Sequence, residues 1–138
     1  MEINLTRKNN LFHFEAKNAS GELLQMDANP VIGGEGKGFR PMETLLAGLG
    51  GCSGIDVVNI LTKQKAALKD LQIQIKASRK ETEIPAIFEE INVHYILIGD
   101  LEKSKVEKAL QLTFDKYCSV AHILGATARL SYTFEIKA

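Results

Sequence analysis

The sequence of 138 residues carries no net charge, because 17 basic side chains balance 17 acidic ones. Such a chain gains little by neutralising a phosphate backbone, and its isoelectric point near 6.8 lies below the range of dedicated nucleic-acid binders. The sequence also lacks any run of about 18 consecutive apolar residues, which a membrane span would need. We therefore expect neither nucleic acid nor a membrane as a partner.

The first residues lack the apolar core of a secretory signal, because polar and apolar side chains alternate there. A cytoplasmic location is the resulting expectation. With 45% apolar and 25% charged residues, the composition is that of a globular protein, and the length predicts a single domain over residues 1–138.

Cysteine is scarce, with only Cys52 and Cys118 in the chain. Two cysteines cannot form a disulfide framework, and a zinc site needs more ligands at a recognised spacing, so we expect no metal. Lone thiols in a reducing compartment are usually buried apolar side chains, and a redox pair is the less common alternative. Composition and spacing leave both interpretations open.

Hydrophobic periodicity predicts an α+β fold. Six segments alternate apolar and polar residues and are predicted to be strands; they lie at 3–5, 12–16, 24–26, 71–78, 91–97 and 130–136. The first three form an N-terminal β-meander joined by short turns.

Two helices are expected between the later strands. Residues 41–65 carry apolar side chains around the whole circumference, which predicts a long central helix buried on most sides. The second helix is amphipathic, begins after Asp100 as its N-cap and ends at Cys118, after which Ser119 can cap a further short turn. The predicted order is three strands, the central helix, two strands, the second helix and a C-terminal strand.

Four glycines lie in the first half of the central helix, and each costs about 0.8–1 kcal/mol relative to alanine. Close packing is the favoured explanation, because Gly48 and Gly51 would let a second helix or a dimer mate approach. A thinned surface that lets a small substrate reach Cys52 is compatible with it. The glycine-rich segment 29–41 before the helix matches neither a P-loop nor a dinucleotide fingerprint, so we expect a mobile loop there.

Two motifs carry a resemblance. PMETLLAGLGGCSGIDVV at 41–58 and DKYCSV at 115–120 resemble the OsmC/Ohr superfamily, and within it the YhfA-like branch. The resemblance covers nearly the whole chain and implies an OsmC-like fold and an intertwined homodimer with active sites at the interface.

By the same resemblance, Cys52 takes the peroxidatic position and Cys118 the resolving one. This implies a cysteine-based hydroperoxide reductase of oxidative-stress defence, with small organic hydroperoxides as substrates. It would need an external dithiol reductant and no bound cofactor. A largely apolar site would favour alkyl hydroperoxides over hydrogen peroxide.

The hydroperoxide-reducing branch supports its cysteine with an arginine from the N-terminal hairpin region and a glutamate directly after the proline. Here Met42 follows the proline, so Glu43 is the substitute candidate. On a continuous helix Glu43 and Cys52 lie on opposite faces, so Glu43 would need an irregular first turn or would serve the partner subunit. A simple role as a first-turn acid is equally compatible. Arg7 and Arg40 are the available arginines in the N-terminal third.

Three alternatives remain. The chain could be a non-enzymatic binder of a small apolar or acyl ligand with structural cysteines. A hot-dog thioesterase also wraps a sheet around a long helix, but its consecutive strands are interrupted here by the second helix. A cysteine hydrolase using Cys118 and His122 lacks an evident third group. Asp56, one turn after Cys52, would oppose thiolate formation if it faces the thiol.

Overall fold

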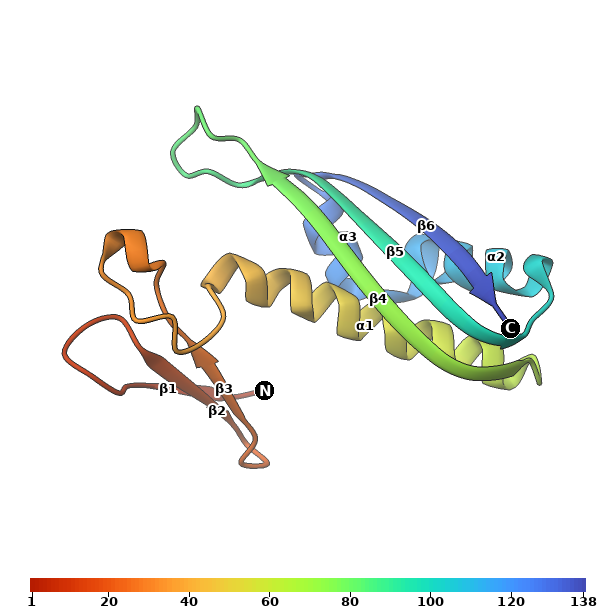
Figure 1. Cartoon of the computed structure of the whole chain (residues 1–138), viewed down its shortest axis with the longest axis horizontal. Coiled ribbons are helices and arrows are strands. Elements are labelled where there is room, and N and C mark those ends of the chain that lie inside the picture. Colours follow the sequence, from red (N-terminus) through yellow and green to blue (C-terminus); the bar gives the residue numbers. More distant parts are fainter. The chain divides into compact units, whose positions relative to one another are not determined.

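The computed structural model describes all 138 residues, which form two compact units, Met1–Ala47 and Gly48–Ala138. Each unit has its own three-stranded sheet (Figure 1). The predicted α+β class is confirmed. Two compact units defined by backbone contacts can belong to one domain or to two. The single domain expected over residues 1–138 therefore stays a prediction.

The sheet of the first unit is the predicted meander. Strands β1 (Ile3–Arg7), β2 (Phe14–Asn18) and β3 (Leu23–Met26) pair antiparallel in that order. The Asn18 side chain accepts hydrogen bonds from backbone N–H groups of the β2–β3 turn, including that of Glu22 at 2.9 Å. This local bonding explains why an asparagine marks the turn in the sequence.

The loop after β3 is anchored by one buried carboxylate. Asp27 is 2% exposed and accepts hydrogen bonds from the N–H groups of Ala28, Glu35 and Lys37. A short 3₁₀ turn, η1 (Pro30–Ile32), lies within the loop. The segment predicted to be mobile is thus held at several points along its length.

Helix α1 (Pro41–Lys63) begins where the sequence predicts and ends two residues earlier, because Lys65 has a positive φ of 52°. At its start the Glu43 carboxylate accepts a hydrogen bond from the Arg40 N–H at 2.9 Å, which satisfies one of the free donors of the first turn. By length and composition α1 could span a membrane, a criterion that core helices of soluble proteins also meet.

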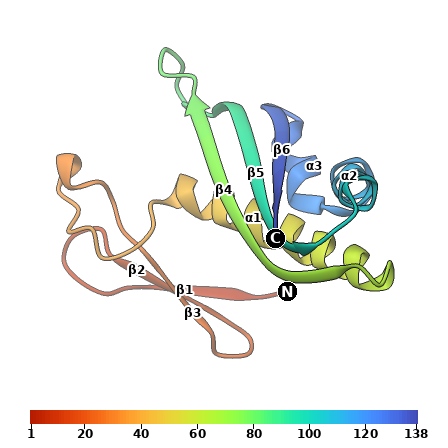
Figure 2. The same cartoon turned by 45° about the vertical axis from the view of Figure 1, so that its right-hand side comes forward.

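The second unit is built on the sheet β4 (Ala67–Arg79), β5 (Phe88–Asp100) and β6 (Arg129–Lys137), with β5 in the centre. β4 pairs antiparallel with β5, and β6 pairs parallel with it. β5 is the most buried strand, as expected of a central one. Helices α2 (Lys103–Leu112) and α3 (Ser119–Gly125) lie on the same side of the sheet as α1 (Figure 2).

The other side of this sheet is polar. His94 Nδ1 is 2.8 Å from the Thr133 hydroxyl, and the Asn92 amide donates to Ser131 at 3.0 Å. These pairs confirm the polar face that alternation in the sequence predicts. His94 is therefore a surface residue of the sheet, away from the helices.

The second predicted helix is divided in the structure. Its α-helical part ends at Leu112 and a wide π-helical turn, η2 (Thr113–Tyr117), follows. The predicted caps are wrong: Glu102 rather than Asp100 precedes the helix, without a side-chain hydrogen bond, and Cys118 rather than Ser119 caps α3. The Thr113 hydroxyl donates to Ala109 O, and such back-bonding commonly distorts a helix.

The prediction that the central helix is buried on most sides is wrong for the single chain. Only one face of α1 is buried, and its buried residues are Leu49, Ser53, Gly54, Val57 and Leu61. Ile55 is 72% exposed, and Val58 is also exposed. A three-stranded sheet with two short helices covers only one side of such a helix, so the remaining apolar side chains stay uncovered.

Candidate active site

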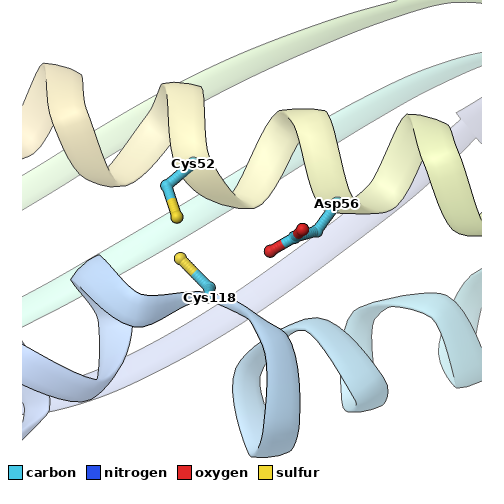
Figure 3. Close-up of side chains that lie close together, drawn as sticks. All are labelled: Cys52, Asp56 and Cys118. Carbon is cyan, nitrogen blue, oxygen red and sulfur yellow. The ribbon is translucent and has the colours of Figure 1, made fainter.

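The two cysteines lie together in the second unit. The sulfurs of Cys52 and Cys118 and a carboxylate oxygen of Asp56 all lie within 4.8 Å of one another (Figure 3). Both thiols are free; Cys52 is partly exposed, and Cys118 is only 3% exposed. The structure thus brings together two residues that are distant in the sequence.

A buried hydrogen-bond chain fixes this part of α1. The Tyr95 hydroxyl of β5 donates to Ser53 Oγ at 2.6 Å, and Ser53 Oγ donates to Leu49 O at 2.8 Å. Burial raises the pKa of Tyr95 well above its usual value, so the phenol stays protonated and keeps this donor role. Because Ser53 directly follows Cys52, the contact with β5 sets which way Cys52 faces.

The turn η2 positions the second thiol. Phe114 stacks on Tyr132 of β6 with 4.6 Å between ring centroids, and it meets Tyr95 edge-on. The Cys118 N–H donates to Thr113 O at 2.8 Å, which closes the wide turn. Cys118 then leaves the helical conformation, and its sulfur accepts a hydrogen bond from the Ala121 N–H at 3.4 Å as the cap of α3.

The electrostatics of the cluster disfavour charge. Burial raises the pKa of Cys118 to about 11, with further increases from Cys52 and Asp56 and a smaller opposing contribution from the Ala121 N–H. Burial also raises the pKa of Asp56. Asp56 Oδ2 is buried and has no hydrogen-bond partner. Asp56 thus faces the thiols, which is the condition under which the sequence predicts that it opposes thiolate formation.

An open hollow of about 380 Å³ lies beside Cys118, lined by η2 and the start of α3. His122 is among its lining residues and is exposed. Its backbone N–H donates to Cys118 O at 3.1 Å, as in any first helical turn. No hydrogen bond joins the imidazole to the Cys118 sulfur, so the geometry gives no support to a cysteine hydrolase.

The other predicted site residues belong to the first unit. Glu43 caps the Arg40 N–H, which is the first-turn role considered above. The Arg7 guanidinium donates to the carbonyls of Leu11, at 2.9 Å, and Asn10, which ties it to its own hairpin loop. A catalytic role for Glu43 stays a prediction, as does that of an arginine.

The sequence does not predict the contribution of Ser53 and Tyr95. For Asp56 it predicts only that a carboxylate facing the thiol would oppose thiolate formation. The four-residue step from Cys52 to Asp56 was the available signal, because it places both on one helix face. The cluster offers three donor atoms, one fewer than a structural zinc site uses, and the absence of a metal cofactor stays a prediction.

Comparison with known proteins decides the family. The family model described as OsmC-like protein matches residues 34–133, most of the chain. The chain belongs to the OsmC-like family. Protein YhfA from Escherichia coli K12 is 39% identical to it over 126 residues, which cover 91% of this chain and 90% of YhfA. The resemblance to the YhfA-like branch is therefore confirmed.

Solved structures agree with this OsmC-like assignment. A hypothetical protein from Aquifex aeolicus has a TM-score of 0.81 and 33% identity, and the match covers 99% of this chain and 97% of that one. An organic hydroperoxide resistance protein OsmC from Legionella pneumophila has a TM-score of 0.73 and 16% identity, with 97% and 95% covered. At that identity the second likeness shows the fold alone. Helices α2 and α3 lie between β5 and β6, whereas a hot-dog fold has consecutive strands there. The OsmC-like fold therefore excludes the hot-dog alternative.

Proposed function

We propose that this OsmC-like protein is a thiol peroxidase that reduces small organic hydroperoxides in oxidative-stress defence. The observation that carries the proposal is the placement of two free thiols within 4.8 Å of each other at the partly buried cluster. The Legionella protein that shares the fold is an organic hydroperoxide resistance protein, in keeping with this chemistry.

The Cys52 thiolate attacks the distal peroxide oxygen, the O–O bond breaks, and the alkoxide leaves and takes up a proton to become an alcohol. Cys52 is thereby oxidised to a sulfenic acid. The Cys118 sulfur then displaces hydroxide from the Cys52 sulfur, which forms a disulfide and, after protonation, water. An external dithiol reduces the disulfide by exchange.

Cys52 is assigned the first role because it is the more exposed of the two thiols, whereas Cys118 is almost fully buried. Two aromatic side chains pack beside the cluster: Tyr95 contacts Ser53, the neighbour of Cys52, and Phe114 lines the hollow beside Cys118. An organic substituent finds favourable contacts in such surroundings, whereas hydrogen peroxide has no apolar group to bury. Alkyl hydroperoxides are therefore the expected substrates.

We further expect a homodimer. The uncovered apolar side of α1 and the edge of β4 form an open groove of about 1030 Å³, lined by residues that include Gly51, Ile55, Val58 and Leu71. A Cβ added at Gly48 or Gly51 meets nothing within 4 Å in the single chain. These two glycines therefore have no packing role within the chain, in keeping with a surface that a partner covers. The cytoplasmic location stays an expectation.

Counting free thiols tests the peroxidase. Reduced protein mixed with one equivalent of cumene hydroperoxide should lose both thiols, Cys118→Ser should lose one as a sulfenate, and Cys52→Ser should lose none. If the unmodified protein keeps both thiols, the peroxidase proposal is refuted. The groove beside α1 would then favour the alternative, a non-enzymatic binder of a small apolar or acyl ligand with structural cysteines.

A further inference from the structure

Asp56 is the one member of the cluster to which the proposed chemistry gives no role. Its Oδ2 atom is buried without a hydrogen-bond partner, which is uncommon for a polar atom in a folded protein. Burial is the cause of its raised pKa, so no neighbouring cation compensates its charge. A carboxylate oxygen that is buried without a partner requires a reason.

The second step of the proposed reaction needs a base. Cys118 must lose its proton to attack the oxidised Cys52, and burial raises the pKa of Cys118 to about 11. At neutral pH its thiol therefore keeps the proton unless a nearby group accepts it. General base catalysis of such a transfer typically accelerates a reaction by about 10²–10⁴-fold.

The groups around Cys118 leave one suitable acceptor. The Tyr95 phenol is protonated and donates to Ser53, and Cys52 is the atom under attack in this step. Asp115, Lys116 and His122 line the hollow beside Cys118 but are exposed, and none of these side chains makes a hydrogen bond to the sulfur. The Asp56 carboxylate lies within 4.8 Å of both sulfurs and has a free acceptor atom (Figure 3).

We propose that Asp56 is the acid–base residue of the thiol pair: its carboxylate takes the Cys118 proton and returns it to the leaving group on Cys52. This inference rests on the proposed function. The S–S bond forms as the S–O bond of the sulfenic acid breaks, the Cys118 sulfur is oxidised, and the Cys52 sulfur is reduced. The proton passes from Cys118 through Asp56 to hydroxide, which leaves as water, and Asp56 is regenerated as a carboxylate.

The attack by Cys118 can be measured without peroxide. One equivalent of dithiobis(nitrobenzoate) labels the more exposed Cys52 and releases one nitrothiobenzoate anion. Cys118 then displaces the second anion as the disulfide closes, and the absorbance of that anion gives the rate. Cys118→Ser should stop after the first release, which identifies the second release as the closing step.

Asp56→Asn keeps the size of the side chain and removes the proton acceptor. We expect the second release to become about 10²-fold slower at neutral pH, and Asp56→Glu to restore part of the rate. Asp100→Asn, a change of an exposed aspartate outside the cluster, should close at the unmodified rate. Equal closing rates for Asp56→Asn and the unmodified protein would overturn the proposal.

The pH profile of the unmodified protein provides a readout that does not depend on a variant's folding. With Asp56 as base, the closing rate levels off at the pH where the carboxylate is ionised and falls on acidification as the carboxylate takes up its proton. An increase of about tenfold per pH unit through neutrality is the behaviour of an unassisted thiol and would contradict the proposal. Because this assay uses no peroxide, its failure and the failure of the peroxidase proposal can be told apart.

Discussion

At the scale of single residues, one hydroxyl connects the central strand to the cysteine helix. Tyr95 is fully buried, and its only polar contact is the hydrogen bond to Ser53. Tyr95→Phe removes that bond, while Ser53 keeps Leu49 O as its acceptor. We expect a loss of about 0.5–1.5 kcal/mol in the free energy of unfolding, measured by urea denaturation. Tyr132→Phe is the matched control, because the Tyr132 hydroxyl has no hydrogen-bond partner, and an equal loss there would contradict this account.

Asp27 gives a prediction for the first unit. Burial disfavours its charge, but hydrogen bonds from the Lys37, Ala28 and Glu35 N–H groups outweigh burial and hold the pKa below its usual value of 3.8. A lowered pKa means that the ionised group stabilises the fold above pH 3.8, and that this stability is lost as the pH falls through the lowered value.

Asp27→Asn should therefore lower the melting temperature at neutral pH, and the difference from the unmodified protein should shrink on acidification through that range. Thermal melts at a series of pH values check this. Asp100→Asn should melt like the unmodified protein throughout. A difference for Asp27→Asn that is the same at every pH would show that the charge contributes nothing.

The sequence was sufficient to select Cys52 and Cys118 but not to place Asp56 beside both. The motifs around the cysteines carry the family resemblance, and the structure brings the two sulfurs together. The position of Asp56 depends on the rotation of α1 about its axis, which the Tyr95–Ser53 contact sets. Pairing of that kind between distant segments leaves no periodic signal in the sequence.

At the scale of elements, the turn η2 decides where Cys118 lies. Phe114 fills the space between η2 and the sheet by stacking on Tyr132 and meeting Tyr95 edge-on. Phe114→Leu should loosen the turn, speed alkylation of the buried Cys118 and slow disulfide closure, as measured by iodoacetamide labelling and mass spectrometry. The control is Tyr117→Leu, which replaces an exposed aromatic ring in the same turn. Equal labelling of Cys118 in both variants would contradict a positioning role for Phe114.

Periodicity predicts the strands and the second helix, because each carries a regular apolar pattern, and the long apolar segment 41–65 predicts the central helix; the order of these elements is correct. The division of the second helix at Leu112 was not predicted, because Thr113 and Phe114 fit the amphipathic pattern of a continuous helix. The wide turn is closed by the Cys118 N–H on Thr113 O, and the tertiary contact that accompanies it is the packing of Phe114 against Tyr132 of β6.

At the scale of the whole molecule, the uncovered side of α1 predicts self-association. Ile55 is 72% exposed in the single chain, so Ile55→Ser removes little buried surface from it. If a second copy covers this groove, the variant should shift the dimer toward monomer in light scattering after size exclusion. Ile84→Ser, at an exposed loop outside the groove, should leave the mass unchanged. An unmodified protein that is monomeric at all concentrations would refute the dimer.

The most direct test of the central claim follows both products of one turnover. Reduced protein is mixed with one equivalent of cumene hydroperoxide, cumyl alcohol is quantified, and peptides are mapped by mass spectrometry. The account predicts one alcohol for each Cys52–Cys118 disulfide formed, with a slower disulfide step in Asp56→Asn. Hydroperoxide left intact, or alcohol formed without that disulfide, would contradict it.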